Sequence, residues 1–279
     1  MTGNGEARSP GLGTLQFALK VQDATVEFRA QLPEGPVRPA VLLPILQNLS
    51  DSMTGLAERN LAQLGDKISC REGCGACCRQ AVPISPVEAS ALVEWLDQQP
   101  EERQKVLRER FRQAAARLEE SGIAAAVRAF EKMPEREAAH QLGLRYFALG
   151  IACPFLEEER CTIHKIRPLR CREYLVVSPA EHCAHPASRD IVGVKPPVLL
   201  SNILSRWDTN GDAQPPGLIL LAMLEEWSAK HATDQSRPRR TSPELVQEFL
   251  HAFARESDAA PADPRTTGPP EVLPERSDL

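Results

Sequence analysis

The sequence predicts a mainly α fold, an irregular helical domain with a metal-bound cysteine cluster and a small β-hairpin at the N-terminus. Three observations predict it. Apolar residues recur at helical spacing through most of the chain, and two short runs near the N-terminus alternate with a period of two. All eight cysteines lie between Cys70 and Cys183, which leaves both ends of the chain free of thiols. The middle of the chain is therefore the part that we expect to carry chemistry.

Five segments are expected along the 279 residues. They are a disordered N-terminus (1–14), a hairpin plus helix (15–66), a cysteine-cluster metal-binding domain with a helical insertion (67–190), C-terminal helices (191–256) and a disordered tail (257–279). Both outer segments contain little apolar surface, so burial cannot offset the entropy of ordering them.

The predicted hairpin rests on two alternating runs: Leu15, Phe17, Leu19 and Val21, then Val26, Phe28, Ala30 and Leu32. A short polar gap between such runs is typical of a tight turn between antiparallel strands. A helix is expected to follow from Pro39 and to end at Gly65, because glycine suits the position just after a helix.

The next helices are marked by their first turns. Ser85, Pro86 and Glu88 have the order of an N-cap, a first-turn proline and a capping-box carboxylate, and they predict a helix to about Gln99. A second helix is expected from Pro100, with a core-facing stripe of Leu107, Phe111, Ala114, Ala115 and Leu118.

Four later helices are predicted from apolar spacing alone or from a cap. One should start near Pro134 and end at Gly150, and the others should lie at 198–207, 218–227 and 245–253, the last capped by Ser242 and Pro243.

Charge and hydropathy exclude several classes of partner. A net charge of -5 and a pI near 5.8 argue against binding to nucleic acid or to a membrane surface, because a polyanion needs a basic field. No targeting segment and no apolar run long enough to cross a bilayer is evident. We therefore expect a cytoplasmic protein, whose thiols stay reduced and are more suited to metal than to disulfides.

The first four cysteines have the spacing of metal ligands. Cys70, Cys74 and Cys77 are three or four residues apart, within the range from which tetrahedral zinc sites draw their ligand pairs. Gly73 and Gly75 flank Cys74, and we expect both to adopt positive φ and let the backbone wrap tightly around an ion.

The neighbouring pair Cys77 and Cys78 bears on the question of how many ions are bound. Adjacent side chains point apart, so both rarely bind one ion terminally, and two sites or a bridging sulfur are indicated. Eight cysteines fit two four-thiolate sites and equally fit a polynuclear cluster, and the sequence leaves both open. The predicted ligands are Cys70, Cys74, Cys77, Cys78, Cys153, Cys161, Cys171 and Cys183.

Cations are expected near these thiols, since a divalent ion held by four thiolates carries about two negative charges. The stretch 161–172 contains no acidic residue and four cations: Lys165, Arg167, Arg170 and Arg172. Arg71 and Arg79 bracket the first cluster. The alternative is that some of these arginines simply pair with the carboxylates at 157–159.

The cysteine motifs also resemble a known family. They are Cys70-x3-Cys74-x2-Cys77-Cys78, Cys153-Pro-Phe-Leu, Cys161-Thr-Ile-His164 and Arg167-Pro168-x-Arg170-Cys171-Arg172. In this order they are similar to the YkgJ-type cysteine cluster family of zinc- or iron-chelating domains, over a stretch from about residue 69 to 186. The resemblance implies a metal cofactor, zinc or iron, including the case of an iron–sulfur cluster, and it adds no reaction.

This chain departs from the family at two places. Members often have tyrosine where His164 stands, and the charged insertion between Gln99 and Met133 separates the two halves of the motif. His164, His182 and His185 rank below the cysteines as ligands. The sequence does not reveal a protein partner.

Two other functions stay open. The Cys70, Cys74 and Cys77 spacing is similar to that of radical S-adenosylmethionine enzymes, although Ala76 stands where those enzymes usually have an aromatic residue. A flagellin lysine methylase is similar in carrying this cluster, so an iron–sulfur-dependent methyltransferase is the enzymatic alternative. Cys74-Gly-Ala-Cys77 is also a dithiol of the kind used in redox sensing, without the βαβ context that such motifs usually have.

Overall fold

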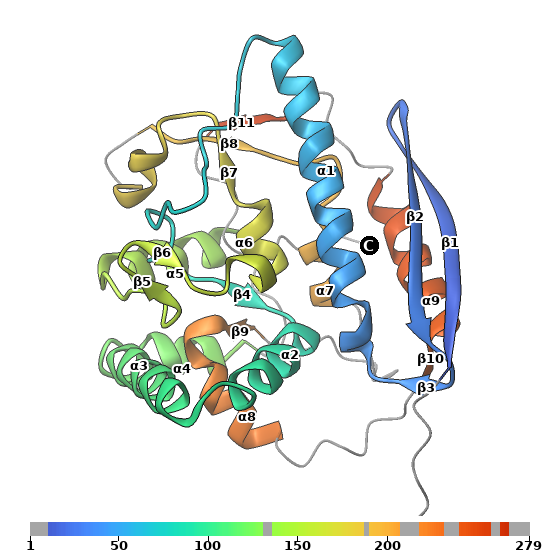
Figure 1. Ribbon diagram of the computed structural model, residues 1–279. Coiled ribbons are helices and arrows are strands. Elements are labelled where there is room, and N and C mark those ends of the chain that lie inside the picture. The colour runs from blue at the N-terminus through green and yellow to red at the C-terminus, as the bar shows by residue number, and fades with distance from the viewer. Residues whose placement is uncertain are drawn as a thin grey trace, which may run out of the picture.

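The computed structural model describes residues 11–130, 136–186, 190–206, 218–231, 240–257 and 263–267, and it is mainly helical, as predicted (Figure 1). Its α-helices are α1 (Leu43–Gln63), α2 (Pro86–Asp97), α3 (Glu101–Glu120), α4 (Ile123–Arg128), α5 (Arg136–Ala148), α6 (Leu169–Glu173), α7 (Leu200–Arg206), α8 (Leu224–His231) and α9 (Ser242–Ser257). Single turns of 3₁₀ helix are η1 (Pro39–Leu42), η2 (His164–Ile166), η3 (Ala180–Ala184) and η4 (Leu221–Met223).

The predicted hairpin is confirmed, and it is longer than expected. Strands β1 (Leu12–Val21) and β2 (Ala24–Pro33) pair antiparallel around a two-residue turn, in which Gln22 has φ +53°. Turns of this hand match the twist of the two strands. The ordered strand begins inside the segment that we expected to be disordered.

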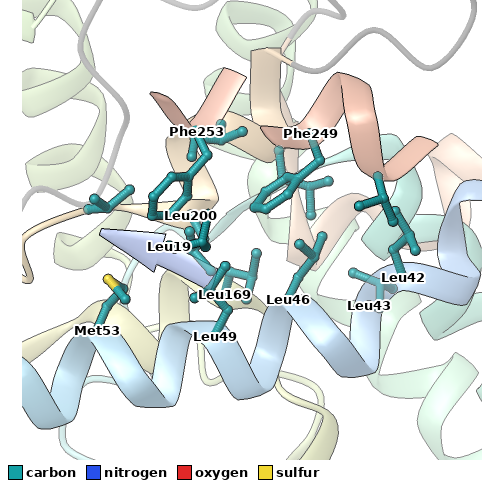
Figure 2. Packing of buried hydrophobic residues seen from close by; sticks show 14 of the residues in the cluster. Leu19, Leu42, Leu43, Leu46, Leu49, Met53, Leu169, Leu200, Phe249 and Phe253 are labelled. Atoms are coloured by element: carbon teal, nitrogen blue, oxygen red, sulfur yellow. The ribbon is translucent and has the colours of Figure 1, made fainter. Parts of the chain in front are cut away.

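The largest core lies between this hairpin, α1 and α9 (Figure 1). Figure 2 shows Leu19 of the hairpin, Leu49 of α1 and Phe249 of α9 directed toward one another, together with Leu169 and Leu200. Leu169 is fully buried and belongs to α6, the helix that carries Cys171. The core therefore anchors the helix that carries one predicted ligand.

A further core surrounds Phe155 and includes residues of α2, α3 and α8, which lie in the lower part of Figure 1. The Phe155 ring meets Phe111 of α3 at 5.3 Å and Trp95 of α2 at 5.9 Å between centroids, both edge to face. The predicted stripe of α3 is confirmed, because Leu107, Phe111, Ala114 and Leu118 are buried and Ala115 is half-buried. Phe155 is two residues from Cys153, so this core positions a second predicted ligand.

The capping box of α2 is confirmed in both directions. The Ser85 hydroxyl accepts from the Glu88 backbone N–H, and the Glu88 carboxylate accepts from the Ser85 N–H at 2.9 Å. The helix ends at Asp97, two residues before the predicted end.

The short strands that follow the N-terminal hairpin were not predicted. They are β3 (Pro36–Val37), β4 (Pro83–Ile84), β5 (Leu156–Glu157), β6 (Arg160–Cys161), β7 (Leu175–Val176), β8 (Val192–Val194), β9 (Ile219–Leu220), β10 (Arg240–Thr241) and β11 (Arg265–Thr267). They pair as β3 with β10, β4 with β9 and β5 with β6, and β8 pairs with β7 on one side and with β11 on the other. Strands of two or three residues are too short to show a period in the sequence.

Two predictions need correction here. The helix expected at 218–227 begins only at Leu224, because β9 pairs with β4 and η4 follows. The tail expected to be disordered from 257 includes the last residue of α9 and β11, which pairs with β8. The predicted helix start near Pro134 lies outside the described residues. No helix in the described ranges combines the length and apolar character needed to cross a membrane.

Candidate metal centre

Four stretches of chain carry the cysteines. Cys70, Cys74, Cys77 and Cys78 lie on the loop between α1 and β4, Cys153 and Cys161 on and beside the β5–β6 hairpin, Cys171 on α6, and Cys183 on η3. All eight are free thiols; Cys183 is buried and the others are half-buried. Each stretch is held in place by a different set of contacts.

The first loop is a series of tight turns. The Cys74 N–H donates to the Arg71 carbonyl at 3.2 Å, and the Cys78 N–H donates to the Gly75 carbonyl at 2.9 Å. Gly73 has φ +83°, as predicted. Gly75 does not have positive φ, so the conformational reason that we gave for it is wrong.

Gly75 is required by a close approach instead. A Cβ atom at this position would lie 2.6 Å from the Glu159 carbonyl oxygen and 2.9 Å from Leu156 Cδ1, both on the β5–β6 hairpin. Arg79 forms a bidentate ion pair with the Glu159 carboxylate, at 2.6 and 3.0 Å. The first cysteine loop is therefore docked directly onto the hairpin that carries Cys161.

Backbone contacts of the hairpin connect the segments that carry three cysteines. Glu158 and Glu159 form its turn with φ of +47° and +59°, so Leu156 pairs with Cys161. The Leu156 N–H donates back to the Cys153 carbonyl, and the Cys153 N–H donates to the Cys78 carbonyl, both at 2.8 Å. Cys153 thus sits between the base of the hairpin and the end of the first loop.

Helix α6 is held by buried polar contacts on both sides of Cys171. The Leu169 N–H donates to the Glu88 carboxylate at 2.7 Å, and Glu173 accepts from the Leu200 N–H at 2.7 Å. Arg170 donates to the Asn202 side chain at 2.7 Å. This network links the motif around Cys171 to α2 and α7.

Cys183 is connected to the first loop through Tyr174. The Tyr174 hydroxyl accepts from the Gln80 amide at 2.7 Å and hydrogen-bonds to the Cys183 thiol. Burial, followed by the thiolate charges of Cys77, Cys70 and Cys74, raises the pKa of Cys183 to about 12. Sequence reasoning missed Gln80 and Tyr174, because no spacing relates them to each other or to Cys183.

A cavity of about 290 Å³ opens beside the thiols. Five cysteines line it: Cys70, Cys74, Cys77, Cys171 and Cys183. His164 and Arg167 complete one wall, and Thr54 and Glu58 of α1 another. The sulfur atoms therefore have space beside them that protein atoms do not fill.

Arg167 is the arginine whose charge acts on the pKa of several cysteines. Its charge lowers the pKa of Cys70, Cys161 and Cys171 against the larger effect of burial, and it lowers that of Cys77 together with the larger effect of the hydrogen bond from Cys78. Its Nε atom is buried without a hydrogen-bond partner. A cation with an unused donor at this position fits an anionic metal–thiolate group.

Arg79 and Arg172 have carboxylate partners. Arg79 pairs with Glu159, so the alternative of simple ion pairing holds for this residue. Arg172 pairs with Asp51 at 2.8 Å, and Glu157 pairs with Arg103 and with Arg110.

Most of the thiols favour the neutral form. Burial raises the pKa of Cys153 to about 12 and that of Cys171 well above its ordinary value. Cys77 is the exception, since a hydrogen bond from the Cys78 thiol lowers its pKa to about 7 and raises that of Cys78. An ion that binds here must displace protons from most of its ligands, so its affinity depends on pH.

The three histidines are placed differently from the thiols. His164 Nε2 contacts Arg167 Nη1 at 2.7 Å, which occupies this nitrogen. His182 Nδ1 contacts the Asp190 carbonyl oxygen at 2.9 Å, and His185 is exposed.

Across the described ranges, no three His, Cys, Asp or Glu side chains are arranged so that they could hold a metal ion as they stand. The donor set fits zinc or iron in kind, and binding requires the thiols to turn toward one another.

Residues 69–188 match the model of a protein family, CxxCxxCC, described as a "putative zinc- or iron-chelating domain". This segment includes all eight cysteines, so the match confirms the resemblance drawn from their spacing. Searches of curated proteins and of solved structures find no match.

Proposed function

We propose that this protein chelates zinc or iron through the eight cysteines, and that the metal joins four separate stretches of chain into one folded unit. The observation that carries the proposal is the meeting of these stretches. The first loop is docked on the β5–β6 hairpin through Gly75 and Arg79, and Cys183 is linked to it through Tyr174.

The chemistry of the donors supports the same conclusion. Thiolates are soft ligands that favour zinc, iron–sulfur clusters and similar metals over magnesium or calcium. Arg167 supplies positive charge beside thiols from all of the stretches except that of Cys183. A metal bound here would replace thiol protons by an ion that this charge helps to balance.

The metal would dominate the stability of this region. Structural zinc contributes roughly 10–16 kcal/mol to the folding of small peptides, whereas a whole domain is usually stable by about 5–15 kcal/mol. The strands that join the cysteine stretches here have only two or three residues each. We expect the metal-free segment to lose much of its defined structure.

The test is purification of the full chain without oxygen, followed by metal analysis and a visible spectrum. Zinc chelation predicts a colourless protein, and an iron–sulfur cluster predicts a brown one that contains sulfide. A strong chelator should then reduce the helical circular dichroism signal. The variant Cys78→Ser should lose metal, and His140→Ala, which changes an exposed residue of α5, should retain it. Metal-free wild-type protein with unchanged structure would refute the proposal.

One observation favours the enzymatic alternative. Cys70, Cys74 and Cys77 all line the open cavity, as three ligands of an iron–sulfur cluster with an accessible iron would. An iron–sulfur-dependent methyltransferase would be brown as isolated and would consume S-adenosylmethionine after reduction. Colourless zinc protein without this turnover would exclude it.

We also propose a cytoplasmic location without a nucleic-acid partner. The free thiols would persist in a reducing compartment, and the net charge of -5 opposes polyanion binding. Loss of metal from protein directed to an oxidising compartment would support the first point.

A further inference from the structure

We propose that the N-terminal hairpin is a dimer interface, in which strand β1 pairs antiparallel with β1 of a second copy of this chain. The two hairpins would then form one four-stranded sheet, in the order β2, β1, β1, β2. The dimer does not depend on the proposed metal binding, because no cysteine lies on the hairpin.

The outer edge of β1 presents backbone groups that are free to pair. The two-residue turn makes Val21 and Ala24 a hydrogen-bonded pair, and such pairs alternate along an antiparallel ribbon, so every second residue of β1 directs its N–H and C=O away from β2. Among the described residues no third strand pairs with this ribbon, and Figure 1 shows β1 at the right-hand margin, on the side of β2 away from α1. The outward-directed residues are all exposed: Leu12, Thr14, Gln16, Ala18 and Lys20.

The two edges of the ribbon differ in how they are protected. Soluble proteins commonly block edge strands with charged side chains or with proline. The outward-directed residues of β2 include Glu27, Arg29 and Pro33, and the Pro33 carbonyl already accepts from the Ser242 hydroxyl at 2.8 Å. The outer edge of β1 contains no proline and only one charge, Lys20 near its end. Pairing is therefore expected at β1 and not at β2, which limits the assembly to two copies.

The apolar face of the hairpin is only partly covered by its own chain. Near the turn, Leu19 and Val21 are buried against the core, with exposed fractions of 9% and 1%. Farther along β1, Leu15 and Phe17 pack on the same core but remain half-buried. A second hairpin beside β1 would extend the sheet and remove more of these two side chains from water, which favours association.

One register makes two β1 strands complementary. Gln16 of one copy would meet Gln16 of the other at a two-fold axis, and the outward-directed residues would exchange their backbone hydrogen bonds. On the apolar face, Leu15 would lie opposite Phe17 of the other copy. On the polar face, Lys20 would lie opposite Leu12, so no two like charges are opposed. A second copy of this chain is therefore a partner that this edge fits.

The test is sedimentation of reduced full-length protein over a range of concentrations, where we expect a monomer–dimer equilibrium for wild type. Gln16→Lys and Gln16→Glu each oppose like charges at the axis, so each should raise the dissociation constant roughly fivefold. An equimolar mixture of the two variants opposes unlike charges and should restore the wild-type affinity. Gln31→Lys changes an exposed residue on the same face of the hairpin but on β2, and as the matched control it should dimerise like wild type.

Amide hydrogen exchange of the wild type gives a second readout that needs no variant. The amides of Thr14, Gln16 and Ala18 should exchange more slowly at high protein concentration than at low concentration, whereas those of Glu27 and Arg29 should not change. A wild type that is monomeric at every concentration would overturn the proposal, as would a dimer that neither Gln16 variant weakens. Protection at β2 instead of β1, or a mixture that associates no more tightly than its components, would overturn it too.

Discussion

Substitution of Gly75 by alanine tests how closely the first cysteine loop approaches the β5–β6 hairpin. The added Cβ would lie 2.6 Å from a backbone oxygen, the Glu159 carbonyl, and 2.9 Å from Leu156 Cδ1. Real Cβ atoms essentially never come so close, so one of the two segments must move. Forced packing of this kind costs typically about 1–3 kcal/mol. One kcal/mol shifts the melting temperature by about 2–4 °C in a domain of this size, so we expect Tm to fall by about 2–12 °C.

The matched control is Gly143→Ala in α5, where an added Cβ meets no atom within 4 Å. Replacing glycine by alanine inside a helix should stabilise the protein by roughly 0.5–1 kcal/mol, so Tm should stay or rise. Thermal unfolding of the metal-loaded proteins, followed by circular dichroism, measures both variants. Equal Tm values for Gly75→Ala and wild type would refute the docking of the loop on the hairpin.

Three further predictions concern the scaffold. Ser85→Ala removes the cap that accepts from Glu88 N–H and should lower the free energy of unfolding by about 1 kcal/mol in urea; an unchanged midpoint would contradict the capping role. Phe155→Ala should cost about 3–5 kcal/mol and weaken metal retention at nearby Cys153, and a loss under 1 kcal/mol would contradict its central place in the core. Hydrogen bonding from Arg128 lowers the pKa of Glu226 to about 2, so its contribution to stability is present above its unfolded pKa near 4.5 and is lost as pH falls through 2. Glu226→Gln should flatten acid unfolding in that range, and an unchanged acid slope would count against the ion pair.

Features that depend on neighbouring residues in the sequence were predictable. The order Ser85, Pro86 and Glu88 contains all the groups of the capping box, and the box forms as predicted. Likewise, the two runs with a period of two predicted the two strands that pair as the hairpin. The cysteine motifs likewise predicted the family whose model matches residues 69–188.

Features that depend on distant partners were not predictable. Leu220 lies in a run with helical spacing, yet it forms a strand because it pairs with Pro83. Gly75 was assigned to a turn, whereas its lack of a side chain is required by the Glu159 carbonyl. The link from Gln80 through Tyr174 to Cys183 likewise exists only after folding. Contacts across such separations leave no pattern in one sequence.

X-ray absorption at the metal edge of anaerobically purified protein tests the central claim most directly, because it identifies the atoms bound to the ion. The account predicts a first shell of about four sulfur atoms, at about 2.3 Å if the ion is zinc. A shell of nitrogen and oxygen at about 2.0–2.2 Å, or protein that contains no metal, would contradict it.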